Sequence, residues 1–319
     1  MTDSFSRQIQ YMRISVTDHC NANCIYCAPN SMKHYPLEEL LTHDEFLRIC
    51  GIFASLGVQH FRITGGEPLM YKDCARLVRN LKNTAGVKTV SITTNAINMH
   101  THIEKLILSG IDSINISLDT VTPNIYKKMS GVDKCNDVFT AINEAMRHKI
   151  KLKINTVVIK GINNSEVLPL AELAKNNPID VRFIEFMPSK TNLEIKGIPN
   201  EVILQSIKAK YPDIHMCDKL HGMGPAVYYE SKYLQGKIGF ISPHSHNFCE
   251  SCNRVRLSST GFLRLCLHHP HGVDLRKLLR NNASDDDIKS EILHAVRYKP
   301  RQHLMKTKTI LDEMHKIGG

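Results

Sequence analysis

The sequence predicts an α/β fold, an incomplete TIM-like barrel of six parallel βα units whose open side is covered by a C-terminal region. Three observations support this fold class. Short runs rich in β-branched residues alternate with segments of helical periodicity, and most runs end in a polar or glycine-containing cluster. The alternation stops near Asn200. Because the carboxyl ends of parallel barrel strands converge on one face, the clusters predict an active site there.

The six predicted strands are short and enriched in Val, Ile, Thr and Phe. A repeat of strand, helix and strand favours parallel pairing, because each helix returns the chain to the same edge of the sheet. The clusters at the carboxyl ends include "TGGEP" at 64–68 and "SLD" at 117–119. The predicted strands occupy residues 11–17, 60–64, 89–94, 112–119, 152–159 and 180–186.

The first predicted helix lies in "THDEFLRICGIFASLG". Thr42 is placed to cap its start, Glu45 completes a capping box, and Gly57 is a typical C-terminal stop. A later helix is predicted in "NEVILQSIKAKY", and the acidic run Asp285 to Asp287 indicates an exposed helix start.

The change of pattern predicts two regions. Residues 1–199 would form the partial barrel. Residues 200–319 would close the open side of the barrel and end in a Gly-Gly tail.

Composition and charge narrow the class of protein. With 319 residues, 42% of them hydrophobic and 23% charged, the chain suits a folded protein. It shows no signal peptide or membrane span, so we expect a cytoplasmic protein without membrane association. The net charge of +10 suits a polyphosphate as well as nucleic acid. Since Trp is absent and no basic strip is interleaved with aromatic residues, we expect no nucleic-acid partner.

Ten cysteines are present, and six of them fall into two tight clusters. Short spacers of this kind are typical of metal ligation in a reducing compartment. The isolated cysteines are expected to be buried: Cys50, Cys74, Cys135 and Cys217.

The first cluster, Cys20-x3-Cys24-x2-Cys27, offers three thiolates and no fourth nearby. Closed zinc and ferredoxin-type sites need four ligands, and the next cysteine, Cys50, lies in a predicted buried helix. The spacing therefore indicates an iron–sulfur cluster with one iron open to a ligand. A zinc site with His19 as fourth ligand is the alternative, although it leaves "TGGEP" unexplained.

The second cluster, Cys249-x2-Cys252-x13-Cys266, also has three cysteines and no obvious fourth. An iron left open here could hold a substrate atom. Arg254 and Arg256 follow on alternate positions and so share one face of an extended chain. Because guanidinium groups pair with phosphate oxygens, they favour a polyanionic ligand. A zinc ion at this site would instead need one of the nearby histidines: His244, His246, His268 or His269.

The first cysteine cluster and "TGGEP" together match the motifs of radical S-adenosylmethionine (SAM) enzymes, in which three thiolates hold a [4Fe–4S] cluster. Over nearly its whole length the chain resembles the GTP 3′,8-cyclases of molybdenum cofactor biosynthesis, which are lyases with a partial barrel. The resemblance rests on segments in the family's order: "YMRISVTDHCNANCIYC", "FRITGGEP", "SITTN", "INISLD", "LKINTVVIKGIN", "RFIEFMP", "GPAVYY", the second cysteine set and the terminal "IGG".

The resemblance also implies roles for individual residues. Two [4Fe–4S] clusters would be held, the first by Cys20, Cys24 and Cys27, the second by Cys249, Cys252 and Cys266. Residues that would line SAM are Tyr26, Gly66, Ser117 and Met187. Residues that match GTP-binding positions are Arg13, Arg62, Thr93, Lys153, Arg182, Arg254 and Arg256. The expected catalytic residues are Arg13, Arg254 and Arg256.

The implied reaction begins when a 5′-deoxyadenosyl radical takes the hydrogen from C3′ of GTP. The carbon radical attacks C8 of the guanine and gives (8S)-3′,8-cyclo-7,8-dihydroguanosine 5′-triphosphate, the first step of molybdenum cofactor biosynthesis. The resemblance further implies a flavodoxin or ferredoxin reductant, transfer of the product to cyclic pyranopterin monophosphate synthase, and a homodimer. Two residues depart from the family's usual pattern and leave the local loop shape open, Ala28 where methionine is common and Ala96 where glycine is usual.

Two other functions agree with parts of the sequence. One is a radical SAM maturase that modifies peptides and carries an auxiliary cluster. The other is a non-catalytic zinc protein that binds nucleic acid through its positive charge. Consumption of GTP would separate the first from a cyclase, and the metal content would separate the second.

Overall fold

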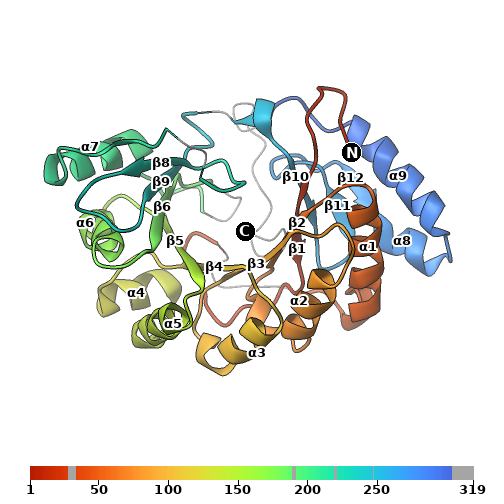
Figure 1. The fold of residues 1–319 in the computed structure, drawn as a ribbon, viewed down its shortest axis with the longest axis horizontal. Helices are drawn as coiled ribbons and strands as arrows, with labels where there is room; N and C mark the ends of the chain where they lie inside the picture. Colours follow the sequence, from red (N-terminus) through yellow and green to blue (C-terminus); the bar gives the residue numbers. More distant parts are fainter. Residues whose placement is uncertain (28–33, 189–191, 219–220, 247, 304–319) are drawn as a thin grey trace.

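The computed structural model describes residues 1–27, 34–188, 192–218, 221–246 and 248–303. These residues contain one sheet of twelve strands in the order β12-β11-β10-β1-β2-β3-β4-β5-β6-β9-β8-β7. Strands β1 to β6 are parallel neighbours in chain order and form the curved wall of an incomplete barrel (Figure 1). They span Tyr11–Ser15, His60–Thr64, Thr89–Thr94, Ser113–Ser117, Lys151–Val157 and Asp180–Ile184. All six predicted strands are therefore confirmed, each within two residues at either end.

Strands from the later part of the chain extend this wall at both edges. Next to β1 lies β10 (Arg254–Leu257), which runs parallel to it, and next to β6 lies β9 (Ile238–Ile241), also parallel. Antiparallel strands continue outward from each: β11 (Phe262–Arg264), β12 (Gly272–Asp274), β8 (Val227–Glu230) and β7 (His215–Met216). The sheet remains open, so the predicted incomplete barrel is confirmed.

Helices cover the outside of the curved sheet (Figure 1). The α-helices are α1 (His43–Ser55), α2 (Cys74–Lys82), α3 (Ile103–Leu108), α4 (Pro123–Ser130), α5 (Cys135–Arg147), α6 (Val167–Ala171), α7 (Asn200–Lys210), α8 (Leu275–Arg280) and α9 (Asp285–Arg297). Short 3-10 helices are η1 (Leu37–Glu39), η2 (Pro68–Met70), η3 (Met99–Thr101), η4 (Asn164–Glu166), η5 (Glu172–Ala174) and η6 (Cys249–Ser251).

Helix starts follow the predicted capping chemistry. Thr42 and Glu45 form the capping box of α1, and Gly57 beyond its end has φ of +91°, as the helix stop requires. The acidic start of α9 is also confirmed, with Ser284 and Asp287 as its capping box.

The two faces of the barrel strands differ in polarity. In β1, Met12 and Ile14 are fully buried in the core, together with Phe46 of α1. The alternate residue, Arg13, faces the other way, towards the interior of the curved wall, because successive strand residues point to opposite faces. The apolar face therefore holds the helices, and the polar face lines the interior.

The isolated cysteines divide into two groups. Cys50, Cys74 and Cys135 are buried as predicted. Cys217 is half-exposed, so its predicted burial is wrong: it follows the exposed edge strand β7, and Lys237 Nζ lies 3.3 Å from its sulfur. No helix in the described ranges is long and apolar enough to cross a membrane.

Ala96 has φ of +62°, the left-handed region that glycine adopts without strain, which is why glycine suits this position. Ala28 and the Gly-Gly tail lie outside the described residues.

Candidate active site

The first cysteine set lies in the loop after β1, at the carboxyl end of the strand. The Cys24 pKa is raised well above its usual value by burial and by the negative charges of Cys27, Asp119 and Cys20. The Asn95 side-chain amide lies 3.7 Å from the Cys20 sulfur. The three cysteines therefore lie near enough to one another for the charges of Cys20 and Cys27 to act on Cys24.

The "TGGEP" loop is pressed against this cysteine loop. A Cβ on Gly66 would lie 2.3 Å from the carbonyl oxygen of His19, so only glycine fits. The backbone amides of Gly66 and Glu67 donate to Thr17 O and His19 O, both at 2.7 Å. The two loops therefore form one unit at the ends of β1 and β2.

Glu67 is fully buried beneath this unit, and its carboxylate accepts several hydrogen bonds. The donors are the Thr94 hydroxyl and the Asn95 amide, both at 2.7 Å, and the Leu69 amide at 3.0 Å. Burial raises the pKa of Glu67 to about 7, against the opposing effect of these donors. The carboxylate fastens the motif to the end of β3.

The other residues predicted to line SAM lie around the same rim. Tyr26 donates its hydroxyl to Asp119 Oδ2 at 2.6 Å, and burial raises the pKa of Asp119 to about 6 although that hydrogen bond lowers it. Ser117 ends β4, and Met187 follows β6. The four predicted SAM residues thus come from the carboxyl ends of four different strands, β1, β2, β4 and β6.

Three arginines stand side by side on the inner face of the sheet. The register pairs Arg13 of β1 with Arg256 of β10 on one side and with Arg62 of β2 on the other. Burial and the positive charges of Arg256 and Arg62 hold the pKa of Arg13 well below its usual range. Arg13 Nε is buried and has no hydrogen-bond partner among the described residues. A row of like charges with an unpaired donor fits an anionic ligand.

Arg182 faces this row from β6, on the opposite side of the barrel. Its side chain is buried, one guanidinium nitrogen donates to Asn155 Oδ1 at 2.5 Å, and its Nε has no partner within the described part of the chain. Arg62 also donates to Thr93 Oγ1 at 3.2 Å. The cationic groups therefore surround one interior space.

Lys153, in contrast, is already paired. Its ammonium lies 3.0 Å from Asp180 Oδ2 and donates to the Tyr228 hydroxyl at 2.9 Å. His221 Nε2 lies 2.7 Å from the same carboxylate oxygen. The sequence suggested Lys153 as a GTP contact but gave no sign of this network, because its partners come from β6, β8 and a loop.

The second cysteine set gathers at the amino end of β10. Cys249 and Cys252 precede this strand, and Cys266 follows β11, which runs antiparallel and returns to the same end. Burial would raise the pKa of Cys252, but Lys299 and Arg254 lower it to about 7. The arginine row of β10, β1 and β2 therefore lies between the two cysteine sets.

Lys299 and Arg7 hold the second set in place. Lys299 is almost fully buried and donates to Arg254 O at 2.9 Å and to Leu265 O. Arg7 donates to Cys249 O and to Pro300 O, each at 2.8 Å. Neither residue was singled out from the sequence, since a lone cation carries no motif.

Comparisons with known proteins agree with this architecture. Residues 14–174 match the model of the radical SAM superfamily, and residues 179–305 match that of the molybdenum cofactor synthesis C-terminal domain. Proteins named GTP 3′,8-cyclase from Clostridium perfringens and Heliobacterium modesticaldum are 37% and 39% identical to this chain, each over 100% of both chains. The chain belongs to the GTP 3′,8-cyclase family of radical SAM enzymes. The superfamily implies a [4Fe–4S] cluster and SAM as cofactors.

Solved structures support the fold. Streptococcus suis SuiB bound to SAM has a TM-score of 0.69 at 15% identity, and covers 97% of this chain and 78% of its own. SuiB bound to the precursor peptide SuiA has a TM-score of 0.61 at 16% identity. At such low identity the likeness extends to the fold alone, so it does not favour a peptide substrate.

Proposed function

We propose that this protein cyclises GTP to (8S)-3′,8-cyclo-7,8-dihydroguanosine 5′-triphosphate by radical SAM chemistry, in the first step of molybdenum cofactor biosynthesis. Relatives that match over 100% of both chains carry the name GTP 3′,8-cyclase. The structural observation that carries the proposal is the arginine row of Arg256, Arg13 and Arg62, which lies between two sets of three cysteines. A triphosphate supplies the negative charge that this row lacks.

The first cysteine set would hold the cluster that binds SAM. When bound, the cluster and SAM together supply the 5′-deoxyadenosyl radical that removes the C3′ hydrogen of GTP. Gly66 lets the "TGGEP" backbone approach the ligand, and Glu67 fixes that backbone. The Tyr26 ring, held by Asp119, would lie against SAM, with Ser117 and Met187 on the same rim.

GTP would lie in the interior of the barrel. Arg13, Arg256 and Arg182 would donate to phosphate oxygens, and Arg62 and Thr93, already in contact, would form one side of the site. Lys153 would add charge while Asp180 fixes its position. Hydrogen transfer requires reacting atoms roughly 3 to 4 Å apart, so this clamp would act by orienting the ribose.

The second cysteine set would hold a second [4Fe–4S] cluster that meets the guanine. Lys299 and Arg254 favour the thiolate form of Cys252, which is the form that binds metal. Because this set lies on the opposite side of the arginine row from the first, one GTP molecule bound at the row would extend towards both sets. Residues 200–319 would thus form the region that closes the barrel, with 1–199 as the catalytic wall.

We infer the partners from the resemblance to the family. A flavodoxin or ferredoxin would supply the electron, cyclic pyranopterin monophosphate synthase would take the product, and the chain would act as a homodimer.

The deciding experiment is an anaerobic reaction with reductant, SAM and GTP deuterated at C3′. We expect one deuterium in the 5′-deoxyadenosine formed, together with the cyclised nucleotide, both measured by mass spectrometry. Formation of 5′-deoxyadenosine without consumption of GTP would favour a peptide substrate. Tightly held zinc in place of iron, with no nucleoside formed, would favour a binding protein.

A further inference from the structure

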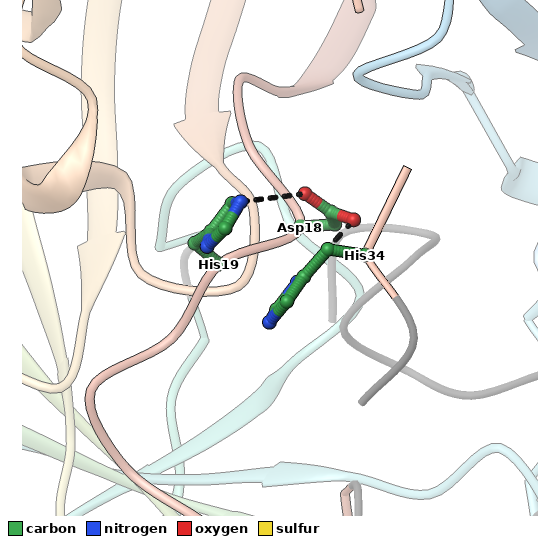
Figure 2. A group of neighbouring side chains, drawn as sticks. All are labelled: Asp18, His19 and His34. Carbon is green, nitrogen blue, oxygen red and sulfur yellow. Dashed lines mark ion pairs between the residues drawn. The ribbon is translucent and has the colours of Figure 1, made fainter. Parts of the chain in front are cut away.

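A cluster of ligating side chains lies beside the proposed SAM site but takes no part in it. It consists of Asp18, His19 and His34, whose ligand atoms all lie within 4.8 Å of one another (Figure 2). His19 and Asp18 come from the loop that follows β1, and His34 comes from the chain that approaches η1. The cluster thus joins two segments that are separate in sequence.

Asp18 is the centre of the cluster. It is fully buried, and its Oδ2 accepts a hydrogen bond from the Tyr35 amide at 2.7 Å. Its Oδ1 has no hydrogen-bond partner in the described part of the chain. A buried carboxylate oxygen without a donor is costly, because it has lost its water and gained nothing in return. The Tyr35 amide fixes the group and leaves Oδ1 available to a ligand.

Each imidazole presents a nitrogen to a different oxygen of this carboxylate. His19 Nε2 lies 3.9 Å from Oδ1, and His34 Nδ1 lies 3.5 Å from Oδ2. The two rings are stacked, with centroids 3.9 Å apart and planes 7° from parallel (Figure 2). Nitrogen and oxygen ligands of a tetrahedral zinc ion stand about 3.3 Å apart, given bonds of about 2.0 to 2.1 Å. In the described conformation the three ligand atoms lie within 4.8 Å of one another, so they would have to move closer together to bind one zinc ion.

The histidine side chains remain accessible, with 44% and 34% of their surface exposed. An ion held by three protein ligands at this surface would keep an open position for water, as exchangeable zinc sites do. The donor set of two imidazoles and one carboxylate suits zinc, cobalt or nickel, and lacks the thiolates that iron–sulfur clusters need.

We propose that Asp18, His19 and His34 form a binding site for a divalent transition-metal ion of the zinc type, distinct from both cysteine sets. The ion would link the loop before Cys20 to residue 34, and so fasten the chain on both sides of the first cysteine set. The proposal does not depend on the identity of the substrate.

The test uses the holoenzyme, reconstituted anaerobically so that the cysteines are occupied by their clusters. Zinc is titrated into it against a chromophoric chelator, and the complex with one equivalent is examined by zinc K-edge X-ray absorption. We expect one saturable ion per chain, with a first shell of nitrogen and oxygen at about 2.0 to 2.1 Å and no sulfur at about 2.3 Å.

Variants assign the ion to the cluster. His34→Ala should weaken zinc binding at least tenfold, and His34→Asp, which restores a ligand, should recover much of the affinity. His148→Ala, which removes an exposed histidine elsewhere, should bind like the unaltered protein. Iron content and visible absorbance, measured in each variant, should not change. Absence of saturable binding, equal affinity in His34→Ala, or a sulfur shell would overturn the proposal.

Discussion

Gly66 is a residue whose missing side chain shapes the site. The His19 carbonyl carbon and oxygen would lie 2.6 and 2.3 Å from an added Cβ, and neither belongs to a flexible side chain. The sequence placed "TGGEP" at the carboxyl end of a predicted strand. It could not indicate a close approach to the cysteine loop, because that contact joins the ends of two strands.

We expect Gly66→Ala to separate these loops and to abolish measurable SAM binding in an equilibrium dialysis experiment. The matched control is Gly51→Ala. Gly51 lies within α1 with no atom within 4 Å of an added Cβ, so alanine there should raise the free energy of unfolding by about 0.5 to 1 kcal/mol and leave SAM binding intact. Unaltered SAM affinity in Gly66→Ala would contradict the close approach.

Other site residues show the limit of sequence reasoning at this scale. The cysteine triads were found because their spacing is a local pattern. Glu67 lies inside the quoted motif, yet its role depends on hydrogen bonds from Thr94, which ends β3, and from Asn95, which follows it. Lys299 carries no motif at all, and only the fold brings it to Cys252.

Strands were predictable because alternation and β-branched composition are local properties. The pairing of β10 with β1 was not, since these strands are more than two hundred residues apart and their contact is decided by the whole sheet. The same pairing creates the arginine row: the sequence placed Arg254 and Arg256 on one face of a strand, and the register set Arg256 beside Arg13.

The row predicts the effect of removing its middle member. Arg13→Ala should raise the Kd for GTP about 10- to 100-fold, because a hydrogen bond to a charged group contributes about 1.5 to 3 kcal/mol. The measurement is isothermal titration of the reconstituted enzyme with GTP in the absence of reductant. Arg79→Ala, an exposed arginine on α2, should leave the Kd unchanged. If Arg13→Ala bound GTP with the same Kd as Arg79→Ala, the arginine row would not be part of the GTP-binding site.

The network that joins β5, β6 and β8 makes a prediction about pH. Burial would raise the pKa of Asp180, but Lys153 and His221 outweigh it and leave the pKa below its usual value. A lowered folded pKa adds stability above the unfolded pKa of about 4, and this stability is lost as the pH falls through the folded pKa. Asp180→Asn should therefore flatten the loss of stability below about pH 4.

At neutral pH, Asp180→Asn should also lower the free energy of unfolding by about 3 to 5 kcal/mol, because it leaves the buried Lys153 without its carboxylate. Circular dichroism during denaturant and acid titrations measures both effects. Asp286→Asn, with a side chain 91% exposed, should change stability by less than about 0.5 kcal/mol. If Asp180→Asn were as stable as Asp286→Asn, the ion pair between Lys153 and Asp180 would not contribute to stability.

At the scale of the whole molecule, the two cysteine sets lie on opposite sides of the arginine row, and the iron content tests whether both hold a cluster. The reconstituted chain should hold about eight iron ions, and the triple variant Cys249→Ser, Cys252→Ser and Cys266→Ser about four. Cys217→Ser, which removes a half-exposed cysteine, should keep the full number. Iron and sulfide assays on anaerobic samples give these values. A full count in the triple variant would exclude the second cluster.

Strand β1 pairs with β10, which is synthesised more than two hundred residues later. One edge of β1 therefore stays unpaired during the intervening synthesis. Until residues 254–257 emerge, the nascent chain carries an unsatisfied hydrogen-bonding edge along Tyr11–Ile14, which in the finished protein belongs to Arg254–Leu257. Completion of the sheet at this edge therefore depends on the synthesis of residues 254–257. If the gene were split near codon 200, each of the two polypeptides would expose an unpaired strand edge. Both polypeptides would then have to be co-expressed to remain in solution.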